Sequence, residues 1–147
     1  MIKRIEQLRS IFTSELDYSK NLSQKLDPFF TSIKNEFDDK KVLEVLESFY
    51  KIRDSHKSIA EDLIEQQKKF GEDWEKISFE LFFKNYPSVR GEYIFFCNER
   101  EDFYEFIVKK KKVLKKKHGK DYKSILKDLH SNTLVIISKI QLFFFFF

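Results

Sequence analysis

The chain has 147 residues, 41% of them hydrophobic, which is enough for one domain with a packed core. Its three glycines and two prolines are too few for the turns of a sandwich, a barrel or a doubly wound sheet. The charged fraction of 35% is typical of long amphipathic helices, and the net charge of +4 is too small to indicate a nucleic-acid partner. We therefore expect an all-α fold, an elongated antiparallel helical bundle.

The first half of the sequence predicts two helices and a short helical stretch between them. Apolar residues recur every three or four positions over residues 2–26, which indicates an amphipathic helix. Pro28 is expected to bend or end this helix, and helical spacing resumes as far as Phe37. A long helix follows over residues 42–70, after a candidate N-cap at Asp38 or Asp39, and it is about 40 Å long at 1.5 Å per residue.

The second half predicts shorter elements. Gly71 is the expected stop of the long helix. Residues 72–86 form an aromatic-rich piece, and Pro87 is expected to begin the next helix, whose apolar stripe extends to Ile107. A break at Gly119 and a last short helix over residues 121–130 complete the bundle.

The final residues, 131–147, differ in composition from the rest of the chain. They are apolar and β-branched and end in five phenylalanines. An unbroken thymine tract encodes such a run, so we hypothesise that the tail is aberrant, from a truncated gene or from read-through of non-coding sequence. A membrane span needs about 20 apolar residues. This tail is shorter and contains Ser138, Lys139 and Gln141, so we expect either a buried C-terminal segment or an exposed apolar patch.

Signatures of covalent catalysis and of metal binding are missing from the sequence. There is no glycine-rich phosphate loop, no CxxC pair, no HxxxH pair and no nucleophile elbow. His56 lies on the apolar stripe of the long helix, which favours a core histidine with a hydrogen-bond partner over a metal ligand. Cys97, the only cysteine, excludes an internal disulfide and is interpreted as a core residue. We expect no enzyme chemistry, no metal and no cofactor, and a cytoplasmic location, because the first ten residues also lack a signal-peptide core.

Three stretches occur in an order that is informative about function. The first is "SELDYSKNL" in the opening helix, the second is "YKIRDSHKSIAEDL" in the long helix, and the third is "YIFFCNE". Their key residues are Ser14, Glu15, Tyr18, Leu22, His56, Leu63, Tyr93, Cys97 and Asn98. Together they resemble the Dbl-homology family, the exchange module for Rho-type GTPases, over roughly residues 4–130.

The resemblance implies a mechanism without covalent chemistry. A Dbl-homology domain binds a Rho-family small GTPase, stabilises its nucleotide-free form, disturbs the Mg²⁺ site and so accelerates GDP release. The family presents a glutamate to the GTPase four positions before its motif threonine, and Ser10 occupies that position here, so Glu6 is a candidate substitute one turn upstream. The implied GTPase-binding residues are Glu6, Ser10, Thr13, Ser14 and Asp17.

The chain departs from the family at its end. The family's long third region is matched only faintly by "IISKIQL", where Ile140 and Gln141 fit but Lys139 and Leu142 replace a proline and an arginine. We therefore interpret residues 1–130 as a partial Dbl-homology domain and expect weakened or absent exchange activity. A non-catalytic helical scaffold is the alternative.

The basic run "KKKKVLKKKHGK" allows three interpretations. It is a solvated helix end, a site for anionic membrane lipid at about 1 kcal/mol per lysine, or a nuclear-targeting or nucleic-acid segment, which the overall charge balance disfavours. The lipid interpretation, with peripheral membrane association, involves Lys109, Lys110, Lys111, Lys112, Lys115, Lys116 and Lys117.

Overall fold

The computed structural model describes residues 2–37 and 39–110, and beyond them residues 112, 115–116, 119, 123–128, 130–132 and 135–136. Across these residues the fold is helical and has no strand, which confirms the predicted all-α bundle. The four α-helices are α1 (Ile2–Asn21), α2 (Asp27–Glu36), α3 (Lys40–Phe70) and α4 (Glu80–Lys109). A π-helical turn, Leu22–Leu26, joins α1 to α2, and a 3₁₀ turn, Trp74–Lys76, lies between α3 and α4.

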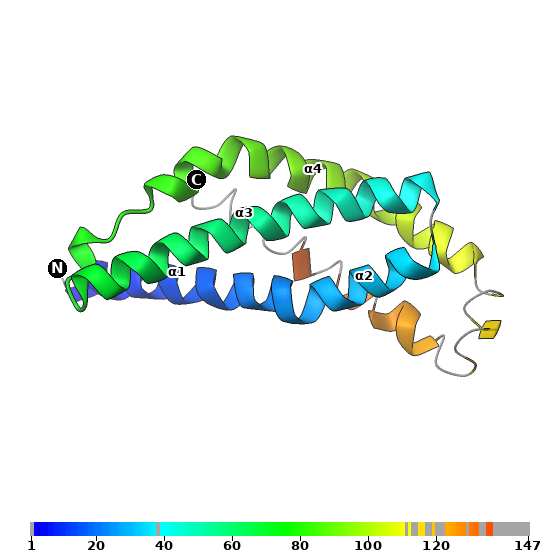
Figure 1. Cartoon of the computed structure of the whole chain (residues 1–147), viewed down its shortest axis with the longest axis horizontal. Helices are drawn as coiled ribbons and strands as arrows, with labels where there is room; N and C mark the ends of the chain where they lie inside the picture. Colours follow the sequence, from blue (N-terminus) through cyan, green and yellow to red (C-terminus); the bar gives the residue numbers. More distant parts are fainter. Residues whose placement is uncertain are drawn as a thin grey trace.

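Helix α3 is the central element of the bundle. It packs against α1, α2 and α4, and in Figure 1 it lies between α1 and α4 and runs antiparallel to both. Its apolar stripe supplies contacts to all three neighbours, and its 31 residues span about 46 Å. The predicted antiparallel pairing of the two long helices is therefore confirmed.

The core is one continuous cluster along the bundle axis. Buried members come from each of the four helices, as expected when every helix turns one apolar stripe inward. The largest fully buried side chains belong to the π turn, α2, α3 and α4, and they are Leu22, Leu26, Phe30, Leu46, Phe49, Ile52, Leu63, Tyr93, Phe96, Phe103 and Ile107. From the last part of the chain, Ile136 also joins this cluster and is fully buried.

The helical path continues through Pro28 instead of ending there. The π-helical turn precedes the proline, which occupies the first turn of α2, where a missing N–H removes no bond that the helix needs. Leu22 and Leu26, at the two ends of the π turn, are fully buried. The turn thus keeps the apolar stripes of α1 and α2 on the same side of one continuous rod.

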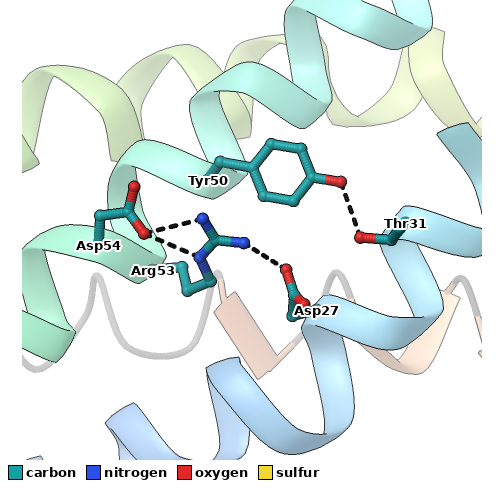
Figure 2. Close-up of polar contacts among 5 residues, drawn as sticks. All are labelled: Asp27, Thr31, Tyr50, Arg53 and Asp54. Atoms are coloured by element: carbon teal, nitrogen blue, oxygen red, sulfur yellow. Dashed lines mark hydrogen bonds and ion pairs between the residues drawn. The ribbon is translucent and has the colours of Figure 1, made fainter.

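A cluster of polar side chains at the surface, shown in Figure 2, fastens α2 to α3. Arg53 pairs with Asp27 at the start of α2 and with Asp54, whose Oδ1 lies 2.8 Å from the arginine Nη2. The guanidinium also lies 4.6 Å from the centre of the Tyr50 ring, and the Tyr50 hydroxyl is 2.9 Å from Thr31 Oγ1. We call these five residues the surface cluster.

Two predicted boundaries have different outcomes. Gly71 caps α3 with φ of 61°, a conformation that strains any side chain with a Cβ, so the predicted stop is confirmed. The prediction that Pro87 begins a helix is wrong, because α4 starts at Glu80 and continues through the proline. Pro87 is exposed, while Phe82 and Val89 on either side are buried in the core. Their packing holds the helix together despite the lost hydrogen bond, and α4 is visibly curved in Figure 1.

Among the residues that the structure describes, no helix has both the length and the apolar character to cross a bilayer.

Candidate docking face on helix α1

Helix α1 directs its polar residues outward. The five side chains that the sequence singled out are all exposed, and they follow one another along the helix at spacings of three and four. With Arg9 they line an open pocket of about 580 Å³. We call this surface, made of Glu6, Ser10, Thr13, Ser14 and Asp17, the α1 face.

Arg9 links the α1 face to the connection between α3 and α4. Its guanidinium lies 5.6 Å from the centre of the Trp74 ring and pairs with Glu72 at 3.7 Å. The Trp74 ring is buried and meets the Phe12 ring edge-on at 5.2 Å. No sequence pattern indicated Arg9, because the partners that position it are more than sixty residues away along the chain.

The opposite side of α1 carries the other half of the same motif. Glu15, Tyr18 and Leu22 are buried against the bundle, whereas Ser14 and Asp17 are exposed. The motif "SELDYSKNL" therefore divides between an outward half and an inward half. Glu15 is unusual in the inward half, because carboxylates are rarely buried unless they are paired.

Glu15 belongs to a chain of hydrogen bonds that joins three helices. Its carboxylate contacts Nδ1 of His56 on α3, and His56 Nε2 lies 2.7 Å from the hydroxyl of Tyr93 on α4. The Tyr93 hydroxyl is also 2.7 Å from that of Tyr18, back on α1. We call Glu15, Tyr18, His56 and Tyr93 the buried network. Its members are between 0% and 9% exposed.

One donor pattern satisfies all three contacts with a neutral imidazole. Tyr18 donates to the Tyr93 oxygen, Tyr93 donates to His56 Nε2, and His56 Nδ1–H donates to the Glu15 carboxylate. The chain of donors then ends on the Glu15 carboxylate, which as an ionised group only accepts hydrogen bonds. The helices α1, α3 and α4 each contribute at least one member, so the network holds α1 at a defined rotation about its own axis.

The two tyrosines of the network have altered acidity. Burial raises the pKa of Tyr18 and of Tyr93 above the usual tyrosine range, because a phenolate loses its hydration there. The negative charge of Glu15 raises both values further. For Tyr18 the hydrogen bond with Tyr93 opposes this rise in part. Both hydroxyls therefore stay protonated over the physiological pH range.

The network has the character of an internal support and not of a reaction site. The prediction that His56 is a core histidine with a partner is confirmed, since it is fully buried and bonded at both ring nitrogens. The identity of its partners was missed. A signal was present, because Glu15 shares the apolar stripe of α1 with Tyr18 and Leu22.

The basic run lies beyond the bundle's central section. Lys109, Lys112, Lys115 and Lys116 are exposed, and Lys110 lies 5.4 Å from the centre of the Phe106 ring. Lys111 and Lys117 fall outside the described residues, as do most of the positions in the predicted apolar tail.

No metal site is formed by the side chains described in the structure, where no three or more of His, Cys, Asp and Glu come close enough together. Cys97 is half-buried and unbridged, and burial raises the pKa of its thiol while nearby Arg100 lowers it.

Comparison with protein-family models, with curated proteins and with solved structures finds no match to this chain. The Dbl-homology resemblance therefore depends on the chain's own motif residues and on where they lie in the bundle.

Proposed function

We propose that this chain is a Dbl-homology-like module that docks a Rho-family small GTPase on the α1 face and stabilises its nucleotide-free form. One observation supports this most directly: the motif on α1 divides into an exposed half, which includes Ser14 and Asp17, and a buried half, which includes Glu15 and Tyr18. A docking helix needs this division, because it must be anchored by one side while it presents the other.

The buried network supports the proposal energetically. A partner binds most tightly to a surface that is already in its bound orientation, because binding then costs no further conformational entropy for ordering that surface. Three hydrogen bonds from α1 side chains and their partners hold the helix against rotation. The α1 face is thus preorganised over three turns.

Release of fluorescent GDP from a Rho-type GTPase tests the proposal. The full chain should accelerate release only weakly, because the third region of the family is matched only faintly. The double variant Ser14→Arg/Asp17→Lys should reduce that acceleration about tenfold by adding bulk and reversing charge at the contact. Glu61→Lys is the matched control, because Glu61 is exposed on α3 and lies outside the face.

Binding measured separately distinguishes the main alternative. If the chain retains nucleotide-free GTPase without accelerating release, it acts as a scaffold that uses the same face. If the double variant and the control bind the GTPase equally, or if the chain binds none, the α1 face is not the docking surface.

A second proposal concerns lipid. The described side chains of Lys109, Lys112, Lys115 and Lys116 are exposed near the end of α4. Each is in a position to attract an anionic bilayer, at about 1 kcal/mol per lysine near the surface. Cosedimentation with phosphatidylserine vesicles, compared with neutral vesicles and with a variant in which these lysines are glutamine, tests this. Equal sedimentation with both kinds of vesicle would contradict it.

A further inference from the structure

A second open pocket lies between α3 and α4, away from the α1 face. It measures about 410 Å³, and no α1 residue is among those described at its walls. We call it the acidic groove. The residues that matter for its chemistry are Glu44, Glu47, Lys51, Gly91, Glu92 and Phe95.

Gly91 is the first feature that indicates a ligand. It lies in the interior of α4, where a glycine destabilises a helix relative to alanine. Its backbone does not require glycine, because only Gly71 and Gly119 have positive φ among the described residues. Packing within the chain does not require it either, because a Cβ at Gly91 would meet no atom within 4 Å. The glycine leaves open the space that forms the groove.

The charge of the groove is the second feature. The carboxylates of Glu44, Glu47 and Glu92 line the groove together with one ammonium group, that of Lys51, although the whole chain carries a net charge of +4. Beside the groove, Lys40 lies 3.9 Å from Glu44. Lys51 lies 3.6 Å from both Glu47 and Glu92 and so ties the two helices together at one end of the groove. Counting both lysines, the groove keeps an excess of one negative charge.

An aromatic surface is the third feature. Phe95 lies one turn beyond Gly91 on α4 and is 37% exposed, so part of its ring is open to the groove. Ser48 Oγ donates to the Glu92 carbonyl at 3.1 Å and so fixes α3 against α4 beneath the opening. A rigid floor, an apolar wall and an acidic rim therefore surround the space that Gly91 leaves empty.

We propose that the acidic groove binds a basic amphipathic helix of a partner protein. A leucine-sized side chain of that helix packs against Phe95 in the space above Gly91, and lysines or arginines one turn to either side pair with Glu44, Glu47 and Glu92. The chemistry is that of a helix laid in a groove, with apolar anchoring and charge-assisted hydrogen bonds at the rim. This site uses no residue of the α1 face and does not depend on the proposed exchange function.

The test is a titration in which a helical peptide is added to the full chain and the binding is monitored by amide nitrogen–proton correlation spectra. The probe is an alanine-based helical peptide of about 16 residues that carries lysine, leucine and lysine at successive turns of one face. The chain has only three glycines, so the Gly91 amide signal is easy to identify. It should shift on binding, while the signals of Gly71 and Gly119 serve as internal references.

Variants of both the groove and the peptide sharpen the test. Gly91→Leu fills the space and should weaken binding about tenfold, as should the double variant Glu47→Gln/Glu92→Gln. Lys51→Met should strengthen binding, because it releases two carboxylates for the peptide, whereas Lys57→Met on the exposed side of α3 should not. A peptide with glutamates in place of the lysines should not shift the Gly91 signal.

The folding of the variants can be checked independently. A Cβ at position 91 meets no backbone strain and no atom within 4 Å, so Gly91→Leu should melt at or above the temperature of the natural chain. The proposal is overturned if the lysine peptide leaves the Gly91 signal unchanged, or if Gly91→Leu binds it as tightly as the natural chain. It is also overturned if the groove signals change with protein concentration alone, because the groove would then be occupied by a second copy.

Discussion

The buried network and the surface cluster of Figure 2 are built alike but lie in different surroundings. In each, a cationic or imidazole side chain on α3 meets a carboxylate on the first helical rod, and a tyrosine hydroxyl lies nearby. The His56 and Glu15 side chains are 0% and 6% exposed, whereas those of Arg53 and Asp27 are 26% and 29% exposed. The comparison shows that contact type does not decide the energy of an interaction, because water competes at one site and not at the other.

The largest expected effect comes from removing the buried carboxylate. Glu15→Ala takes away the acceptor of His56 Nδ1 and leaves a cavity, so the free energy of unfolding should fall by about 3 to 5 kcal/mol in urea denaturation. The matched change Asp27→Ala should cost about 1 kcal/mol or less. Equal losses in the two variants would contradict the difference between the two sites.

A double substitution asks whether the buried network stabilises the fold or specifies its geometry. Replacing both Glu15 and His56 by leucine removes the charge and its partner together. The loss should then be smaller than for Glu15→Ala, because a buried polar pair replaced by apolar groups of similar size is often neutral. Part of the loss should remain, because the Tyr93 hydroxyl no longer has its His56 acceptor. If specificity is its main role, the double variant should stay folded and lose the docking function of the α1 face.

High pH should destabilise the chain through the buried network. The pKa values of Tyr18 and Tyr93 are raised in the folded state, whereas the unfolded tyrosines ionise near pH 10. The folded state therefore holds more protons above that pH, so stability is full below about pH 10 and falls by about 1.4 kcal/mol per pH unit for each tyrosine as the pH rises.

The alkaline titration has a direct spectroscopic check. Of the six tyrosines, Tyr18 and Tyr93 should give no phenolate absorbance until the chain unfolds. Unfolding free energies measured at increasing pH should show a weaker dependence in Tyr18→Phe. Phenolate absorbance from all six tyrosines in the folded chain near pH 10 would contradict the burial of both hydroxyls.

Removal of single hydroxyls compares the two sites on a smaller scale. Tyr93→Phe deprives both His56 and Tyr18 of a hydrogen-bond partner inside the core, which should cost about 2 kcal/mol. Tyr50→Phe removes one bond to Thr31 at a half-buried position and should cost about 0.5 kcal/mol. Chemical denaturation measures both, and the order of the two losses is the decisive result.

The charge pairing of the surface cluster should give a similarly small effect that is the most sensitive to salt. Arg53→Gln removes the pairing with Asp27 and Asp54 and also the guanidinium group that lies over the Tyr50 ring. It should cost about 0.5 to 1 kcal/mol at low salt and less at about 1 M salt, where charges at the surface are screened. The cost of Glu15→Ala should change little over the same range.

The helices could be predicted where their signals are local. Apolar spacing of three and four residues defined α1 and α3, and Gly71 marked the end of α3, because both signals depend on geometry within one or two turns. Pro87 misled the prediction, since the intrinsic cost of a proline in a helix was outweighed by packing on both sides of it. The π turn before Pro28 had no sequence signal that we recognised.

The candidate sites also differ in how far the sequence alone could predict them. The five residues of the α1 face were named from the resemblance to the Dbl-homology family, and the sequence could place them on one surface because they all lie in a single helix. Arg9, the partners of Glu15 and the acidic groove were not predicted, because each combines residues from different helices. A spacing pattern places residues on the same side of a helix but contains no information about which helix that side meets.

The amino-acid sequence by itself determined that the chain is helical, where most of its apolar stripes lie and which side of α1 is polar. Hydrophobic periodicity is a local property of the sequence. Burial of the apolar side of a helix is favourable whichever neighbour covers it, so the polar side stays in water in every packing. The tertiary structure alone decided that Glu15 meets His56 and Tyr93, and that Gly91 opens a groove beside three carboxylates. Those outcomes depend on the rotation and register of whole helices, which are set by the packing of side chains that lie far apart in the sequence.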